Sequence, residues 1–105
     1  MKITVEDKGT AKVIRPYGKI DILTSSELRS TLGELTKKKV MKIIVDLAQV
    51  TYLDSSGLAT LLESLKNLKE YEGKMQLANV PERILKVLSL MKLDLIFDII
   101  QDDSL

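Results

Sequence analysis

The alternation of polar and apolar residues near the N-terminus predicts a β-hairpin. Residues 2–6 alternate strictly, which is the period of a strand with one buried face. A second extended run, residues 11–17, follows a turn segment at residues 7–10 that contains Gly9. Pro16 cannot donate a hydrogen bond to a neighbouring strand, so we expect it at the strand's end, at a bulge or on an unpaired side.

The first predicted helix begins at residue 25 and carries a capping signal. Thr24 and Glu27 form a Ser/Thr-x-x-Glu capping box, in which the Glu27 side chain would reach back to the amide of Thr24. Three lysines at residues 37–39 close the helix, where cations complement the negative end of the helix dipole. The apolar positions, spaced by four and three residues, are Leu28, Leu32 and Leu35.

The middle of the chain predicts a buried strand followed by a long helix. Residues 43–47 are a nearly continuous run rich in β-branched residues, which is typical of a strand buried on both faces, so we expect the central strand here. Residues 48–54 form a connector, and the helix then runs to about residue 72, where Gly73 ends it. Its apolar face consists of Leu58, Leu61, Leu62, Leu65 and Leu68.

The last third predicts one more strand, one more helix and a short edge strand. Residues 75–78 form the strand, and Pro81 lies in the first turn of the helix. Residues 96–100 add the edge strand, and residues 101–105 are polar enough to fray. The apolar positions of this helix are Ile84, Leu85, Val87, Leu88 and Met91.

The order of these elements predicts an α/β fold. A small mixed sheet, made of the antiparallel N-terminal hairpin and parallel strands, would have the helices packed on it. Because strand–helix–strand crossovers are right-handed, we expect the first two helices to share one face of the sheet. With 105 residues, 45% of them hydrophobic, the chain can form one core but not two, so we expect a single domain over residues 1–105.

The composition argues against most enzyme chemistry. The chain has no Cys and no His, which removes thiolate chemistry, the usual zinc sites and histidine proton shuttles. A net charge of +1 gives no broad electrostatic reason to bind nucleic acid or an anionic membrane. No apolar run is long enough to span a bilayer, and the absence of disulfides is compatible with the cytoplasm. We expect a protein that is not an enzyme and needs neither metal nor cofactor.

Binding is expected at the carboxyl ends of the parallel strands, where α/β sheets usually meet their ligands and partners. Two segments qualify, residues 18–24 and residues 46–58, and neighbouring parallel strands would bring them together on one rim. Two aspartates in these segments have a structural interpretation as well. Asp21 can be an ordinary turn residue, and Asp46 can accept hydrogen bonds from amides of the connector.

The run Asp54-Ser55-Ser56-Gly57-Leu58 is the unusual feature of the second segment. Asp54 is a good helix cap, but Gly in a helical turn costs about 1 kcal/mol relative to Ala. We interpret the small side chains at this helix start as leaving room for another backbone or a bulky group to approach it. The alternative is a purely structural cap followed by small polar residues. Leu58 is expected to lie half in the core and half on the rim.

A hydroxyl at a helix N-terminus is also suited to phosphorylation. A phosphoserine adds about −1.5 to −2 charges, which free backbone amides and the helix dipole accommodate, so the host stays folded. A partner packed on the same residues would meet this charge beside Asp54, at a cost on the order of several kcal/mol. Phosphorylation would therefore break a complex without unfolding the protein. Spacing alone does not separate Ser55 from Ser56 as the acceptor.

Two motifs together resemble a known family. Residues 45–58, which include the Asp-Ser-Ser-Gly-Leu run, resemble the signature of STAS domains, specifically of the stand-alone anti-sigma factor antagonists. Residues 18–21, Gly-Lys-Ile-Asp, resemble the Gly-x-Ile/Leu-Asp element of that family. The similarity covers nearly the whole chain in length and element order. Ala59 is a mild departure, because many members carry Gly there.

The resemblance implies a bacterial, cytoplasmic partner-switching protein of transcription regulation, active in a stress response or in sporulation. Unmodified, such a protein binds an anti-sigma factor that is also a serine kinase, and this binding releases the sigma factor. The kinase phosphorylates the first Ser after the Asp, which is Ser55 here, and a metal-dependent serine phosphatase restores it. The residues implied to face the kinase are Asp21, Thr24, Asp54, Ser55, Ser56, Gly57 and Leu58.

Other functions remain alternatives. The chain could be a STAS subunit of a membrane lipid-transport or ion-transport assembly, where the same fold docks without phosphate turnover. A weak nucleotide-binding or hydrolytic role is a third possibility. The sequence leaves open whether the free protein is a monomer or a weak dimer.

Overall fold

The N-terminal hairpin forms as predicted, but its second strand is longer than expected. In the computed structural model, which describes residues 1–105, β1 (Lys2–Lys8) pairs antiparallel with β2 (Ala11–Ile20). The two-residue turn uses Gly9 at a φ of +62°, a left-handed conformation that glycine adopts without strain. Residues 18–20, expected in the loop after the strand, belong to β2 because a second partner strand pairs with them.

Pro16 lies inside β2, on a stretch with a free side. It faces Ile3 of β1, while the other side of β2 pairs with β3 (Lys42–Asp46) only at residues 12–14 and with β4 (Val50–Leu53) only at residues 18–20. Between these two stretches no strand needs a hydrogen bond from residue 16. The expectation of an unpaired side is therefore confirmed.

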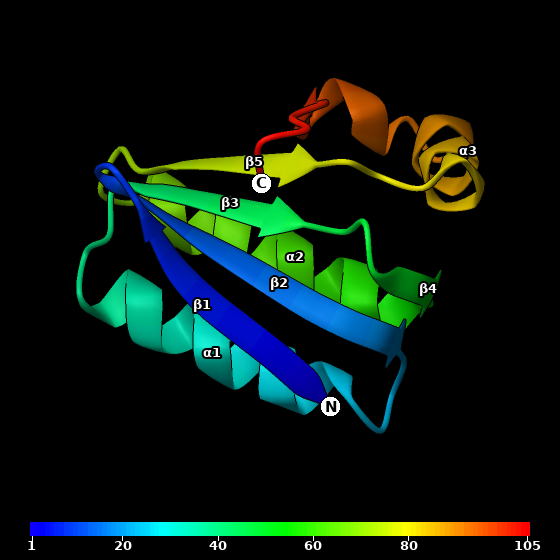
Figure 1. Cartoon of the computed structure of the whole chain (residues 1–105), viewed down its shortest axis with the longest axis horizontal. Coiled ribbons are helices and arrows are strands. Elements are labelled where there is room, and N and C mark those ends of the chain that lie inside the picture. The colour runs from blue at the N-terminus through cyan, green and yellow to red at the C-terminus, as the bar shows by residue number, and fades with distance from the viewer.

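The complete sheet is mixed and carries helices mainly on one face, so the predicted α/β class is confirmed (Figure 1). The strand order is β1-β2-β3-β5-β6, with β4 beside the end of β2, and every pair except the hairpin is parallel. β3 is central, as predicted. The remaining elements are α1 (Ser25–Lys37), α2 (Ser55–Lys69), β5 (Lys74–Ala78), α3 (Glu82–Leu90), the 3-10 helix η1 (Leu93–Leu95) and β6 (Asp98–Ile100).

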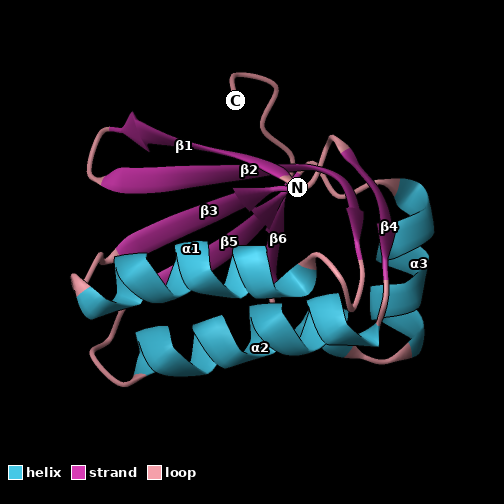
Figure 2. Ribbon diagram, turned by 90° about the horizontal axis from the view of Figure 1, so that it is seen from below, coloured by secondary structure: helices cyan, strands magenta, loops and turns pink.

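Helices α1 and α2 lie side by side on the same face of the sheet, as the right-handed crossovers predict (Figure 2). The main hydrophobic core fills the space between them and the sheet. None of the helices is long and apolar enough to cross a bilayer. The side chains in this core with no solvent exposure include Ile14, Leu28, Leu32, Ile43, Val45, Leu61, Leu68 and Leu77.

The connector expected at residues 48–54 contains a strand that the sequence pattern did not predict. β4 is four residues long and pairs with the end of β2, with Gly18 opposite Val50 and Ile20 opposite Leu53. The pairing register shifts after Gly18, whose φ is +87°. A four-residue strand has too little local signal to be recognised, because its hydrogen bonds depend on a partner about 30 residues earlier.

The end of α2 and the start of α3 also differ from expectation. α2 ends at Lys69 rather than near residue 72, because Glu72 takes a left-handed φ of 63° and the Gly73 amide bonds the Leu68 carbonyl at 2.7 Å. α3 begins at Glu82, one residue after Pro81, which is its N-cap. Both differences are of the size at which helix termini are commonly ambiguous in sequence.

Residues 101–105 do not fray. The Asp102 amide donates to Asn79 Oδ1 at 2.8 Å, and Asn79 Nδ2 donates to the Asp102 carbonyl at 2.9 Å. Lys8 binds the Asp102 carboxylate at 3.1 Å. Leu105 packs against a small cluster, on the sheet face that α1 and α2 leave open, that consists of Ala11, Val13, Ile44 and Ala78. The polarity of this segment therefore serves specific hydrogen bonds rather than solvation alone.

Candidate functional site

The two segments predicted to share a rim do meet at one end of the molecule. Pairing of β4 with the end of β2 brings the turn at residues 21–24 next to the start of α2 (Figure 1). The Asp54 amide donates to the Ile20 carbonyl at 3.1 Å, and the Gly18 amide donates to the Gln49 carbonyl at 3.0 Å. These bonds join the two segments through backbone atoms, so their relative position is fixed by the sheet.

Asp54 caps α2, as predicted. Its Oδ1 accepts hydrogen bonds from the Ser56 amide at 2.9 Å, the Gly57 amide at 3.2 Å and the Ser56 hydroxyl at 2.5 Å. The hydrogen bond from the Ser56 hydroxyl is the main cause that lowers the pKa of Asp54. Desolvation opposes it, and the amides of Gly57, Ser56 and Ile22 each lower the pKa further by less. The carboxylate is therefore a stable negative charge at the helix start.

The structure distinguishes the two serine hydroxyls that spacing could not separate. The Ser56 side chain is half-buried, and its hydroxyl donates to Asp54. The Ser55 side chain is exposed, and its hydroxyl makes no hydrogen bond within the chain. Ser55 therefore presents a free oxygen to solvent at the first position of α2, whereas the Ser56 oxygen belongs to the cap.

Gly57 is small because the chain itself packs against it. A Cβ at this position would lie 2.8 Å from Ile20 Cγ2 and 3.3 Å from the Ile20 carbonyl oxygen, and it would also clash with Leu53. The expectation that the helix start is kept small so that another segment can approach it is confirmed at this glycine, and the approaching residues, Ile20 and Leu53, belong to the chain itself. Leu58 is only 5% exposed and lies in the core, so the expectation that it is half on the rim is wrong. Gly57 and Leu58 can therefore contribute to a binding surface only through the shape they give it, and not through direct contact.

Asp21 and Thr24 form a closed network within the turn. Asp21 Oδ1 accepts hydrogen bonds from the Leu23 amide at 3.0 Å and from the Thr24 amide at 3.2 Å. The Thr24 hydroxyl donates to the Lys19 carbonyl at 2.8 Å. The same hydroxyl accepts from the Asp21 amide at 2.9 Å, so it points into the turn and makes no cap hydrogen bond to α1. Glu27 pairs instead with the N-terminal amine of Met1 at 3.0 Å. The predicted capping box is wrong.

Asp46 has the structural role that the sequence suggested, with an additional partner. Its Oδ1 accepts from the Ala48 amide at 3.0 Å, and its Oδ2 accepts from Arg15 Nε at 2.9 Å. Asp46 is 2% exposed, and its hydrogen bond to Arg15 is the main cause that raises the pKa of the guanidinium. Asp46 is occupied by these contacts and offers nothing to a partner. The sequence pattern contained no sign of the pairing with Arg15.

The sequence pattern also missed a set of exposed apolar side chains near Ser55. Ile22 is 78% exposed, Leu23 is 82% exposed and Tyr52 is 47% exposed. We call these three residues together with Ser55 the rim surface. The available signal was a pair of adjacent large apolar residues inside a turn, where neither a helix nor a strand period gives them a core position.

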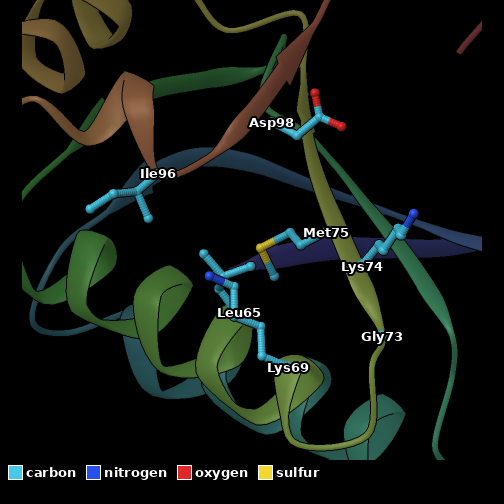
Figure 3. Close-up of a pocket in the computed structure, with 7 residues that line it drawn as sticks. All are labelled: Leu65, Lys69, Gly73, Lys74, Met75, Ile96 and Asp98. Carbon is cyan, nitrogen blue, oxygen red and sulfur yellow. The ribbon is translucent and has the colours of Figure 1, made fainter.

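One groove lies elsewhere and does not involve the rim surface. It has a volume of about 200 Å³ and is separated from Ser55 by the length of α2. In Figure 3, Leu65 and Lys69 of α2 face Met75, while the side chains of Lys74 and Asp98 point away from α2. The groove is lined by Leu65, Lys69, Gly73, Lys74, Met75, Ile96 and Asp98.

Nowhere in the chain do three acidic side chains gather closely enough to hold a metal ion.

Replacing Asp54 tests the cap. Asp54→Ala is expected to lower the free energy of unfolding by about 1 kcal/mol, because two amides and the Ser56 hydroxyl lose their acceptor, whereas Asp54→Asn keeps most of the cap. The pKa of Asp54 is lowered on folding, so its contribution is present above the unfolded value near 4 and is lost as the pH falls through the lowered one. Urea unfolding at pH 7 and at pH 3 measures both effects. An alanine variant as stable as the parent at pH 7 contradicts this account.

The fold is a small α/β domain with a mixed sheet, and its rim surface presents a solvent-exposed serine at a capped helix start. The family model described as "STAS domain" matches residues 2–103. The chain belongs to the STAS domain family, as its two motifs suggested.

Individual relatives agree with this membership. The chain is 30% identical to the anti-sigma-B factor antagonist of Bacillus subtilis over 82 residues, which is 78% of this chain and 74% of that protein. It is 31% identical to the anti-sigma-B factor antagonist of Staphylococcus epidermidis over 71 residues, which is 68% of this chain and 66% of the relative. The matched region thus spans about two thirds of the length of the Staphylococcus protein.

Solved structures confirm the fold. A putative anti-sigma factor antagonist from Thermotoga maritima superposes with a TM-score of 0.90 at 24% identity, covering 97% of this chain and 88% of that one. The anti-sigma factor antagonist SpoIIAA in its unphosphorylated form superposes with a TM-score of 0.77 at 21% identity, covering 96% and 88%. Bacillus SpoIIAA in the phosphorylated form gives 0.78 at 20% identity, covering 96% and 91%.

Proposed function

We propose that this protein is an anti-sigma factor antagonist that binds an anti-sigma factor with serine kinase activity and is switched off by phosphorylation of Ser55. The observation that carries the proposal is the free, exposed hydroxyl of Ser55 at the start of α2, beside a serine whose hydroxyl is already bonded. The names of the related proteins support the general role of a regulator that acts by binding.

The local charges explain how one phosphate can act as a switch. Asp54 already occupies the amides of Ser56 and Gly57, so a phosphate on Ser55 cannot take these donors. The phosphate is then stabilised mainly by the helix dipole and by water. Two neighbouring negative groups then lie where a partner would have to bury them. Binding weakens strongly, while the fold, which does not depend on the Ser55 hydroxyl, is retained.

Phosphate mapping tests the proposal directly. The protein is incubated with its cognate anti-sigma factor kinase and ATP, and the product is mapped by mass spectrometry. We expect one phosphate, on Ser55, in the parent and in Ser56→Ala, and none in Ser55→Ala. Phosphate on Ser56, or none in the parent, contradicts the proposal. A cognate serine phosphatase is expected to return the modified protein to the binding form.

The alternative, an accessory subunit of a membrane transport complex, makes a different prediction for the partner. The same fold occurs in a sulfate transporter family protein from Wolinella succinogenes, with a TM-score of 0.76 at 14% identity. Affinity capture with the unmodified protein is expected to return a kinase. If it returns a transporter component instead, the accessory role replaces the one proposed here.

A further inference from the structure

The turn between β2 and α1 exposes two adjacent large apolar side chains. Ile22 and Leu23 are 78% and 82% exposed, which places both almost entirely in water. Single exposed apolar residues are common on protein surfaces and need no explanation. Two in succession at the tip of one turn are less easily dismissed, because neither side chain contributes to the core of this domain.

This turn is held in one conformation by hydrogen bonds. Asp21 Oδ1 accepts from the amides of Leu23 and Thr24, and the Thr24 hydroxyl ties the turn to the Lys19 carbonyl. The Ser25 amide bonds the Asp21 carbonyl at 2.8 Å, which joins the turn to α1. Because the backbone of this turn is already held in one conformation, it loses little conformational entropy when its apolar side chains bind a partner. The turn therefore meets the condition for an efficient binding anchor.

The turn is also continuous with the surface around Ser55. The Ile20 carbonyl, one residue before the turn, accepts the Asp54 amide at 3.1 Å, one residue before Ser55. Pairing of Lys19 with Tyr52 adds a third exposed apolar side chain to the same area. A protein that covers the start of α2 therefore meets a segment that is joined directly to this turn.

We propose that Ile22 and Leu23 are the apolar anchor by which the protein docks on the kinase that modifies Ser55, inserting into an apolar depression of that partner. Asp21 and Thr24 are positioning residues that hold the turn and do not themselves touch the kinase. This inference rests on the proposed function and adds to it the residues that carry the affinity and the apolar chemistry of the surface that receives them.

The chain offers a matched control for this anchor. Leu90 at the end of α3 and Leu95 in η1 are 85% and 81% exposed, so truncating them removes comparable apolar surface from another part of the protein. The test compares the double variant Ile22→Ala/Leu23→Ala with Leu90→Ala/Leu95→Ala. Calorimetry gives the dissociation constant for the unphosphorylated protein on the kinase, and phosphate incorporation gives kcat/KM.

We expect Ile22→Ala/Leu23→Ala to raise the dissociation constant by about 30-fold, the effect of removing a binding hot spot, and to lower kcat/KM in parallel. At saturating kinase the phosphate still goes to Ser55, and the melting temperature is unchanged because both side chains are exposed. The control variant is expected to bind within threefold of the parent. Equal weakening by the control contradicts the assignment of the anchor to the turn.

A double-mutant cycle tests the role of Asp21. Asp21→Ala in the parent is expected to weaken binding by several-fold and to speed hydrogen exchange of the Leu23 amide, which loses its acceptor. In the Ile22→Ala/Leu23→Ala background the same change is expected to weaken binding no further. Additive losses contradict the inference, because they mean that Asp21 contacts the kinase directly.

The outcomes also separate this inference from the proposed function. If Ser55 is phosphorylated but Ile22→Ala/Leu23→Ala binds like the parent, the anchor is wrong and the phosphorylation switch stands. If the kinase neither binds the protein nor modifies Ser55, both are wrong. If Ser55 is phosphorylated in the parent, and if Ile22→Ala/Leu23→Ala loses binding while the Leu90→Ala/Leu95→Ala control does not, both the switch and the anchor are supported.

Discussion

Ser55→Asp is expected to bind the kinase on the order of 100-fold more weakly than the parent, whereas Ser55→Ala binds like the parent. The Ser55 side chain faces solvent and makes no hydrogen bond within the chain, so the alanine removes only a hydroxyl that the fold does not use. The aspartate places a second carboxylate next to Asp54, and a partner packed on the helix start would have to bury both charges.

Thermal unfolding separates this effect from a loss of structure. Both Ser55 variants are expected to melt close to the parent temperature, because a negative charge in the first turn interacts favourably with the helix dipole and offsets its repulsion from Asp54. Binding is measured by calorimetry with the purified kinase in the absence of ATP. If Ser55→Asp unfolds the domain, the description of the α2 start is wrong, and if it binds like the parent, charge at Ser55 is not the switch.

Gly57→Ala is expected to lower the free energy of unfolding by about 1–3 kcal/mol, although alanine is the better helix former. The added Cβ would lie 2.8 Å from Ile20 Cγ2 and 3.3 Å from the Ile20 carbonyl oxygen. Leu53 can rotate away, but the branched methyl and the backbone of Ile20 sit in the sheet and cannot move without disturbing the pairing of β2 with β4. The melting temperature should fall by roughly 5 to 15 °C.

Gly33→Ala is the matched control for this prediction. Gly33 lies within α1, and a Cβ there would meet no atom within 4 Å. The same substitution is therefore expected to stabilise the protein by about 0.5–1 kcal/mol through helix propensity alone. Urea unfolding of both variants gives the comparison. A Gly57→Ala protein that gains stability as Gly33→Ala does would show that β2 and α2 are not packed as closely as described.

Features with local causes were predictable from the sequence. The hairpin follows from strict alternation around a glycine turn, and the α2 cap follows from one aspartate with amides two and three residues ahead. Both depend on atoms only a few residues apart in the chain. The central position of β3 was also predictable, because a run of β-branched residues with no polar face has to be covered on both sides.

Features that depend on distant residues were missed or misread. The capping box at Thr24 satisfied the local rule, but the Asp21 amide competes for its hydroxyl oxygen and the N-terminal amine of Met1 competes for Glu27. The polar tail at residues 101–105 was expected to fray because its partners, Asn79 and Lys8, are far away in sequence. Local rules assume that a side chain has no better partner elsewhere, and in these two cases it did.

The candidate site shows the same division. Sequence alone predicted a capped helix start with two serines after the central strand, and a turn containing Asp21 at the same end of the sheet. The packing of distant segments was needed to show three further things. Ser55 is free while Ser56 is engaged, Ile20 occupies the space where a side chain at Gly57 would lie, and Ile22 and Leu23 are exposed to water. Helix caps and strand periods arise from neighbouring residues, whereas the exposure of a side chain depends on which distant segments pack over it.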